Sequence, residues 1–210
     1  TGLLGNALGY THQQFDLLSR LQTRIRYAVR RDRLGRQIMD YQTVDLGQDH
    51  LNGTGWTTRG VVEERGKGEA TSGTHIRYRH YRADSVYSLA VSLEPADEEP
   101  SVDTLERALM RPARPLFIGR KPCLPSSPLF LGRRTGESLY EALKEMPRLA
   151  QERADPQMGP IPAWWPVSEA GEGESMEIVV TDERDWRNQI HVGRRRMRRG
   201  SVCPAEVAHE

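Results

Sequence analysis

The stretch Phe15-Asp-Leu-Leu-Ser-Arg-Leu-Gln-Thr-Arg-Ile-Arg-Tyr-Ala-Val-Arg30 changes its periodicity halfway along, and this change decides the fold class. Its first half has apolar residues at the three- and four-residue spacing of a helix. Its second half alternates apolar and basic residues, which is typical of a strand with one buried face. We expect Ile25, Tyr27 and Val29 to fill that face. A helix that leads directly into a strand predicts a mixed α and β fold.

Farther along the chain, a long polar segment precedes two more strands. Residues 45–73 are rich in Gly, Thr and charged residues and have no sustained period, which indicates a long loop of functional or disordered type. The next strand has Arg77 and Arg79 on one side. The strand after it has apolar residues of the same parity at odd positions 87–93, and we expect these to be buried. Because one unbroken strand would carry the arginines into the core, we predict a bulge at 83–85 or a free hairpin.

The order of the elements predicts the topology. A second amphipathic helix should begin at Ser101 and end before Pro112, and residues 115–119 should form a short strand. The order is then helix, strand, strand, helix, strand. One further strand before Thr1 would complete the β-α-β-β-α-β order of a ferredoxin-like fold. The sequence starts at Thr1 rather than at Met, and we expect that upstream residues are absent.

We therefore predict an α+β, ferredoxin-like (RRM-like) body over residues 1–132, with its first strand missing. A protruding β-hairpin thumb should be inserted at about 41–85. Residues 133–210 should form a smaller C-terminal extension that contains β-strands. Its expected parts are a helix at 137–146, a proline-rich connection at 156–166, and strands at 176–180 and 189–192.

The first helix has an unusual composition. Thr1 can cap it, and Gly2, Gly5 and Gly9 fall on one side of its turns. Glycine destabilises a helix by about 0.5–1 kcal/mol relative to alanine. This side of the helix is therefore expected to lie very close to another backbone or to a phosphate chain.

The net charge of +1, from 30 basic and 29 acidic residues, removes bulk positive charge as an argument for a nucleic-acid partner. The charges are nevertheless segregated along the chain. Basic residues cluster at 20–36, 107–134 and 194–199, and acidic residues at 94–106 and 169–185. Opposed surfaces of this kind fit a subunit that contacts both a polyanion and protein neighbours. Solvated charge runs are the alternative.

Several function classes receive no support from the sequence. No apolar run approaches the roughly 20 residues of a membrane span, and no signal peptide is visible, so we expect a cytoplasmic protein without a membrane partner. Cys123 and Cys203 are isolated and lack the spacing of a zinc site or a disulfide framework. The six histidines have no metal-ligand spacing. We expect no metal and no cofactor.

An RNA-binding function is indicated by Arg77-Tyr-Arg-His-Tyr-Arg82, which interleaves rings with guanidinium groups. Single-stranded RNA is held by stacking on rings and by cations at its phosphates. Metal-free RNA cleavage is an open alternative, since His75, His80, Tyr41 or Lys121 could act as base or phosphate-holding cation. A third alternative is a protein-only scaffold that pairs the basic clusters with an acidic partner.

Two segments resemble the signatures of a known family. They are Thr1-Gly-Leu-Leu-Gly-Asn-Ala-Leu-Gly9 and Pro115-Leu-Phe-Ile-Gly-Arg-Lys-Pro-Cys-Leu-Pro-Ser-Ser-Pro-Leu-Phe-Leu-Gly132. Both are similar to those of the CasD family, the fifth-family Cas subunits of the type I-E CRISPR surveillance complex, Cascade. Asp40-Tyr-Gln-Thr-Val44 and Arg79-His-Tyr81 also resemble the family pattern, so the similarity extends from Thr1 to about Gly132.

The resemblance implies a ferredoxin-like body and a hairpin thumb that together hold the 5′ handle of CRISPR RNA. It implies contacts with the backbone subunit CasC and the large subunit CasA, and an indirect contact with target DNA through the complex. It also implies no catalysis, whereas the type I-C relative cuts precursor RNA. Members of the family begin with a strand and a basic loop, which precede the helix that here contains Gly2, Gly5 and Gly9 and that we call the glycine helix. This sequence has neither the strand nor the loop.

The resemblance and the residue pattern together predict the RNA-binding residues. Arg79 should contact the handle, and Phe117 should stack where the family often has a tyrosine. The turn beginning at Gly119 matches the handle-binding turn. The full predicted set is Thr1, Gly2, Gly5, Tyr41, Thr43, Arg77, Arg79, Tyr81, Phe117, Gly119, Arg120 and Lys121. No catalytic residue is predicted.

Overall fold

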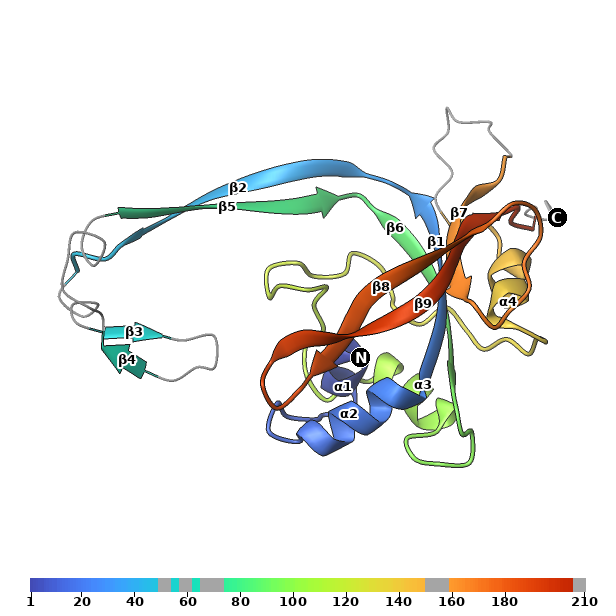
Figure 1. Cartoon of the computed structure of the whole chain (residues 1–210), viewed down its shortest axis with the longest axis horizontal. Coiled ribbons are helices and arrows are strands. Elements are labelled where there is room, and N and C mark those ends of the chain that lie inside the picture. Colours follow the sequence, from blue (N-terminus) through green and yellow to red (C-terminus); the bar gives the residue numbers. More distant parts are fainter. Residues whose placement is uncertain (49–53, 57–61, 65–73, 150–158, 206–210) are drawn as a thin grey trace. The chain divides into compact units, whose positions relative to one another are not determined.

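The structure is a computed structural model, and it describes residues 1–48, 54–56, 62–64, 74–149 and 159–205 (Figure 1). The chain divides into two compact units. We call Thr1–Asp32 together with Tyr87–Glu210 the body, and Arg33–Val86 the arm. The arm includes the residues expected for the thumb, about 41–85, and begins earlier, at Arg33. Each unit is described by itself.

A five-stranded sheet forms the centre of the body (Figure 1). Its strand order is β6 (Val86–Leu93), β1 (Ile25–Arg33), β7 (Ile161–Pro166), β9 (Ile190–Val202) and β8 (Met176–Asp185). Three of these strands come from residues 133–210, which were expected to form a C-terminal extension. They pair antiparallel, β7 with both β1 and β9, and β8 with β9.

The strand β7 differs from the proline-rich connection expected at 156–166. Ile161, Ala163 and Trp165 alternate into the core, which is the burial pattern of a strand. Pairing with β1 is confined to Ala163 and Trp164, between the two prolines of the strand. Both prolines therefore lie outside the two residue pairs that join β7 to β1. A proline within those pairs would lack the N–H that strand pairing needs.

The described residues of the body form four helices that pack against the sheet: α1 (Gly2–Ala7), α2 (Phe15–Arg24), α3 (Val102–Met110) and α4 (Leu139–Glu145). The hydroxyl groups of Ser101 and Ser138 accept backbone N–H bonds and cap α3 and α4. One core cluster joins α2 and α3 to the sheet through Leu21, Ile25, Leu93 and Leu105. A second cluster joins α4 to the sheet, with Tyr140 beside Trp165. The predicted α+β class is confirmed.

The predicted buried faces of β1 and β6 are confirmed only at Ile25 and Leu93, which are buried, and are wrong for the other residues. In β1 the residues Ala28, Arg30 and Asp32 are buried, whereas Tyr27 and Val29 are only partly buried. In β6, Ser88 is buried and the remaining odd-numbered positions are exposed, with relative exposures of 41% for Tyr87, 57% for Leu89 and 36% for Val91. The sequence pattern pointed to the apolar side of each strand, but α4 covers the other side.

A polar network makes this burial possible. The Arg30 guanidinium lies 2.8 Å from the Asp32 carboxylate, and both side chains are fully buried. Arg30 also donates to the carbonyl oxygens of Leu143, Met146 and Pro147 at the C-terminal end of α4. The hydroxyl of Ser88 donates to Asp32 at 2.5 Å. A cation at the end of a helix satisfies carbonyls that have no partner within the helix.

The strand expected over 115–119 does not form. Arg114 instead donates to the carbonyl oxygens of Gly9 and Tyr10, and the Pro115 carbonyl accepts from Asn6. The chain then turns back on itself at Gly119. This segment is held by α1 and by its own turn rather than by a neighbouring strand.

The arm contains a long antiparallel ribbon of β2 (Arg36–Asp45) and β5 (Thr74–Ala83), paired from Arg36 opposite Ala83 to Asp45 opposite Thr74. A shorter pair follows, β3 (Thr54–Trp56) with β4 (Val62–Glu64). The expected break at 83–85 is confirmed: Asp84 has φ +56° between β5 and β6. Of the loop expected at 45–73, residues 49–53, 57–61 and 65–73 lie outside the described residues.

In the described part of the chain, no helix is long and apolar enough to span a membrane.

Candidate nucleic-acid interface

The body brings the glycine helix and the predicted handle-binding turn together, although they are more than 100 residues apart in the sequence. The Asn6 amide donates to the Pro115 carbonyl at 2.9 Å, and the Ala113 N–H donates to the Ala7 carbonyl at 2.9 Å. Arg114 adds two bonds, of 2.7 and 2.8 Å, to the carbonyls that follow α1. These bonds join the C-terminal end of α1 to residues 113–115, which directly precede the predicted turn.

Two of the three glycines expected in the first helix, Gly5 in α1 and Gly9 just after it, lie close to protein atoms. A Cβ on Gly5 would lie 2.6 Å from Leu18 Cδ2, and Gly5 is buried. Gly9 has φ +86°, and a Cβ there would lie 3.1 Å from the Cβ of Ala113. Gly2 is exposed and has only ordinary space toward Trp186. Close packing explains Gly5 and Gly9, so Thr1 and Gly2 are the residues of this set that present surface to a ligand.

The turn after Phe117 is compact and faces solvent. The Ile118 N–H donates to the Cys123 carbonyl at 2.8 Å, and the Cys123 N–H donates to the Arg120 carbonyl at 2.8 Å. Gly119 has φ +80°, a conformation that favours glycine, and the space beside it is open. Leu116 anchors the segment in the body at 8% exposure, and Phe117 is half-buried.

Cations flank this turn. Lys121 is exposed, and Arg120 is half-buried. A ring and cations on a fixed turn are groups of the kind that hold a single-stranded nucleic acid.

The arm divides its predicted RNA-binding residues between two faces. The ribbon register places Arg77, Arg79 and Tyr81 on one face, opposite Gln42, Asp40 and Ile38. Tyr41 and Thr43 lie on the other face, where Tyr41 packs edge-on against Tyr78 with ring centroids 5.6 Å apart. The expected alternation of arginines with Tyr78 and His80 is therefore confirmed. One strand of RNA lying on the arginine face would not contact Tyr41.

The three candidates for metal-free RNA cleavage that lie in the arm are divided between the two faces of its ribbon. His80 and Tyr41 share one face of the ribbon, and the His80 ring nitrogen Nδ1 lies 3.0 Å from the Gln37 amide nitrogen. His75 lies on the opposite face, and Lys121 belongs to the body. Within the described ranges, no group of three or more His, Cys, Asp or Glu residues could hold a metal ion.

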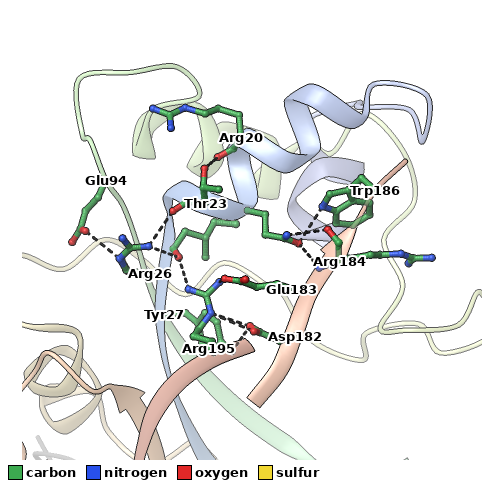
Figure 2. Close-up of polar contacts among 12 residues, drawn as sticks. Arg20, Thr23, Arg26, Tyr27, Glu94, Asp182, Glu183, Arg184, Trp186 and Arg195 are labelled. Carbon is green, nitrogen blue, oxygen red and sulfur yellow. Dashed lines mark hydrogen bonds and ion pairs between the residues drawn. The ribbon is translucent and has the colours of Figure 1, made fainter. Parts of the chain in front are cut away.

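The third basic cluster, at 194–199, mostly forms contacts inside the body. Figure 2 shows Arg195 beside Asp182. Arg195 donates to the Asp182 carboxylate at 3.1 Å and to the Ile25 carbonyl at 3.0 Å. Arg196 pairs with Glu177. The Tyr27 hydroxyl donates to Asp182 at 2.7 Å, and burial together with this bond raises the pKa of Tyr27. This network fixes β1 to the β8–β9 hairpin, so most of this cluster is structural.

Sequence reasoning missed one set of residues in the body that are at least partly exposed. Tyr27 and Tyr87 were assigned to the core, and Trp164 to a connection, yet all three line a hollow on the sheet. One feature of the sequence could have revealed them, namely that the arginines of β5 and the apolar residues of β6 have the same parity. That conflict was explained by a break between the strands, and the apolar residues of β6 were still expected to be buried.

Comparisons with known proteins identify the family. The family model described as CRISPR-associated protein (Cas_Cas5) matches residues 1–198. A solved structure described as "CRISPR RNA-guided surveillance complex" is similar in fold, with TM-score 0.65 and 23% identity, covering 97% of this chain and 76% of that chain. Another, "Crystal structure of Cas protein", has TM-score 0.54 and 24% identity, covering 96% of this chain and 77% of that chain.

No curated protein matches the chain. The two structural likenesses concern the fold, whereas the family model spans all but the last 12 of the 210 residues. The chain therefore belongs to the Cas5 family of CRISPR-associated proteins.

Proposed function

We propose that this chain is the CasD-type subunit of a type I-E CRISPR surveillance complex, and that it binds the 5′ handle of CRISPR RNA without cutting it. The observation that supports this most is the junction of α1 with the turn at 117–121, held by Asn6 and Arg114. Both segments are those that resemble the CasD signatures. The similar fold of a protein described as a CRISPR RNA-guided surveillance complex supports membership of such an assembly.

The arm supplies the second contact. Its arginine face, with Arg77 and Arg79 exposed, offers two cations to phosphates on a ribbon held in register over ten residue pairs. An exposed arginine contributes to RNA binding mainly through charge, so this contact should weaken with salt. CasC and CasA are the proposed protein partners, and target DNA is reached through the complex.

The test uses purified full chain and a labelled single-stranded RNA with the repeat-derived 5′ handle. We expect protection of handle nucleotides and no cleavage over hours without metal. Lys121→Ala should reduce binding, while Arg194→Ala, an exposed cation on β9, should not. A scrambled RNA of equal length controls for charge alone.

Two results would overturn the proposal. Specific cleavage that is lost in His80→Ala or Tyr41→Ala would instead establish the endoribonuclease alternative. A handle that remains unprotected, both with the free chain and in the assembled complex, would leave a protein-only scaffold.

A further inference from the structure

One face of the body's sheet is covered by α2 and α3 only at the end that carries Ile25 and Leu93, and it is open beyond that end. Cross-strand pairs place Val29 opposite Trp164, Trp164 opposite Arg199, and Arg199 opposite Met176. These residues therefore share one face, which we call the open face. Its apolar side chains include Leu89 and Met176, with exposures of 57% and 58%. They lie on the two edge strands, with the apolar side chains of the inner strands between them, and an exposed apolar face of this kind marks an interaction surface.

A hollow lies in the middle of the open face. Its volume is about 230 Å³, and its walls come from all five strands of the sheet. The lining residues are Tyr27, Val29, Tyr87, Trp164, Val180 and Met197. The hollow is smaller than the roughly 300–1,000 Å³ of small-molecule sites. It has room for one large apolar side chain, such as the anchor residues at the centres of protein interfaces.

The rim of the hollow is cationic. The Arg31 guanidinium lies over the Trp164 ring at 5.9 Å, and Arg199 is exposed beside the same ring. Neither arginine forms an ion pair with a described residue. Arg195 and Asp182 neutralise each other near Tyr27. The free charges at the rim are therefore positive, and they select acidic groups on whatever covers the hollow.

We infer that the open face docks a segment of another protein subunit, in which a large apolar residue enters the hollow and flanking Asp or Glu residues pair with Arg31 and Arg199. The inference rests on the proposed function only in that the chain works inside an assembly. Rings and arginines also hold RNA, but a base inside the hollow would find no partners for its polar edges among the apolar walls. A second copy also fits less well, since a two-fold contact would bring like charges together.

Photo-crosslinking in the assembled, purified complex tests the inference. A benzophenone amino acid replaces Leu89 on the open face or, as the control, Val179, which is equally exposed at 58% and lies on the other side of the sheet. We expect position 89 to crosslink to a peptide of another subunit that contains an apolar residue flanked by acidic ones. Crosslinking to RNA, to a second copy, or to nothing would overturn the inference.

Charge placed on the face gives a second measurement. Leu89→Asp should lower retention of the partner subunit roughly tenfold, the effect of losing one interface contact of about 1.4 kcal/mol, while Val179→Asp leaves it unchanged. Equal retention with both variants would contradict the inference. Both variants, as isolated chains, should protect the RNA handle equally well. If the unmodified chain does not protect the handle, that result contradicts the proposed function and leaves the inference about the open face untouched.

Discussion

Two pairs of arginines occur in similar sequence patterns, but one pair is buried and the other is exposed. Arg24 and Arg30 flank the alternating apolar residues at the start of β1, and Arg77 and Arg79 alternate with Tyr78 and His80 on β5. The first pair is fully buried in the body, and the second is exposed on the arm. Alternation alone therefore does not distinguish an arginine that holds the fold from one that is free to bind.

The two pairs differ in the hydrogen-bond acceptors that each guanidinium contacts. Arg24 donates to the carbonyls of Pro95, Glu98 and Pro100, so it fixes the loop before α3. Arg30 fixes the end of α4 and pairs with Asp32. Arg79 meets only the Gln42 side chain, at 3.3 Å, among the bonds described for it. An arginine keeps its charge everywhere, so burial requires such a set of acceptors.

The largest expected effect comes from Arg30→Met. The substitution removes the carbonyl bonds at the end of α4 and leaves the Asp32 carboxylate buried without its cation. Breaking one side of a buried pair destabilises a protein by about 3–5 kcal/mol. Urea unfolding of the full chain measures the loss. Arg30→Met combined with Asp32→Leu should be more stable than Arg30→Met alone, and a single-variant loss below about 1 kcal/mol would show that this arginine is not structural.

The next effect concerns the glycine helix. Gly5→Ala places a Cβ 2.6 Å from Leu18 Cδ2, so Leu18 must move. Overpacking of this kind costs about 1–3 kcal/mol of stability. In a double-mutant cycle, Leu18→Ala should relieve part of the cost of Gly5→Ala. Normal stability with lost RNA binding would instead mean that Gly5 serves RNA directly.

The periodicity of the sequence was sufficient to predict α2, α3 and the alternation of side chains along β5. In each of these elements the spacing of apolar and polar residues within the element itself determines which side chains share a face. The periodicity was insufficient for β1 and β6, where Arg30, Asp32 and Ser88 satisfy one another only after distant segments meet. The strand β7 was missed because its prolines mark a connection unless the pairing register is known.

The candidate site was predictable only in part. The turn at 117–121 and the glycine helix came from a family resemblance, and no local pattern tells that Asn6 reaches Pro115. The separation of Tyr41 from Arg79 follows from strand parity once β2 is paired with β5, a register that the intervening loop conceals. Which residues contact RNA remains a prediction.

A smaller effect on stability is expected from Phe117→Ala. Phe117 is half-buried, whereas the adjacent Leu116 is 8% exposed and anchors the segment. Leu116→Ala, the matched control, should cost about 2–5 kcal/mol of stability. Phe117→Ala should cost less than this control in stability and about 1–3 kcal/mol in RNA binding, through lost stacking. Thermal unfolding measures the loss of stability, and binding titrations measure the loss of RNA affinity. If Phe117→Ala costs more stability than Leu116→Ala and leaves RNA binding unchanged, Phe117 is a packing residue.

The smallest effect on stability, and the sharpest contrast with Arg30, is expected from Arg79→Ala. The side chain is exposed, so the free energy of unfolding should change by no more than about 0.5 kcal/mol. RNA binding should weaken, and the slope of log affinity against log salt should flatten by about 0.7, the value for one lost phosphate contact on a single strand. His80→Ala, exposed on the other face of the same strand, is the control and should leave the slope unchanged. If Tyr41→Ala weakens binding and Arg79→Ala does not, RNA lies on the tyrosine face, and the arginines of β5 are solvated charges.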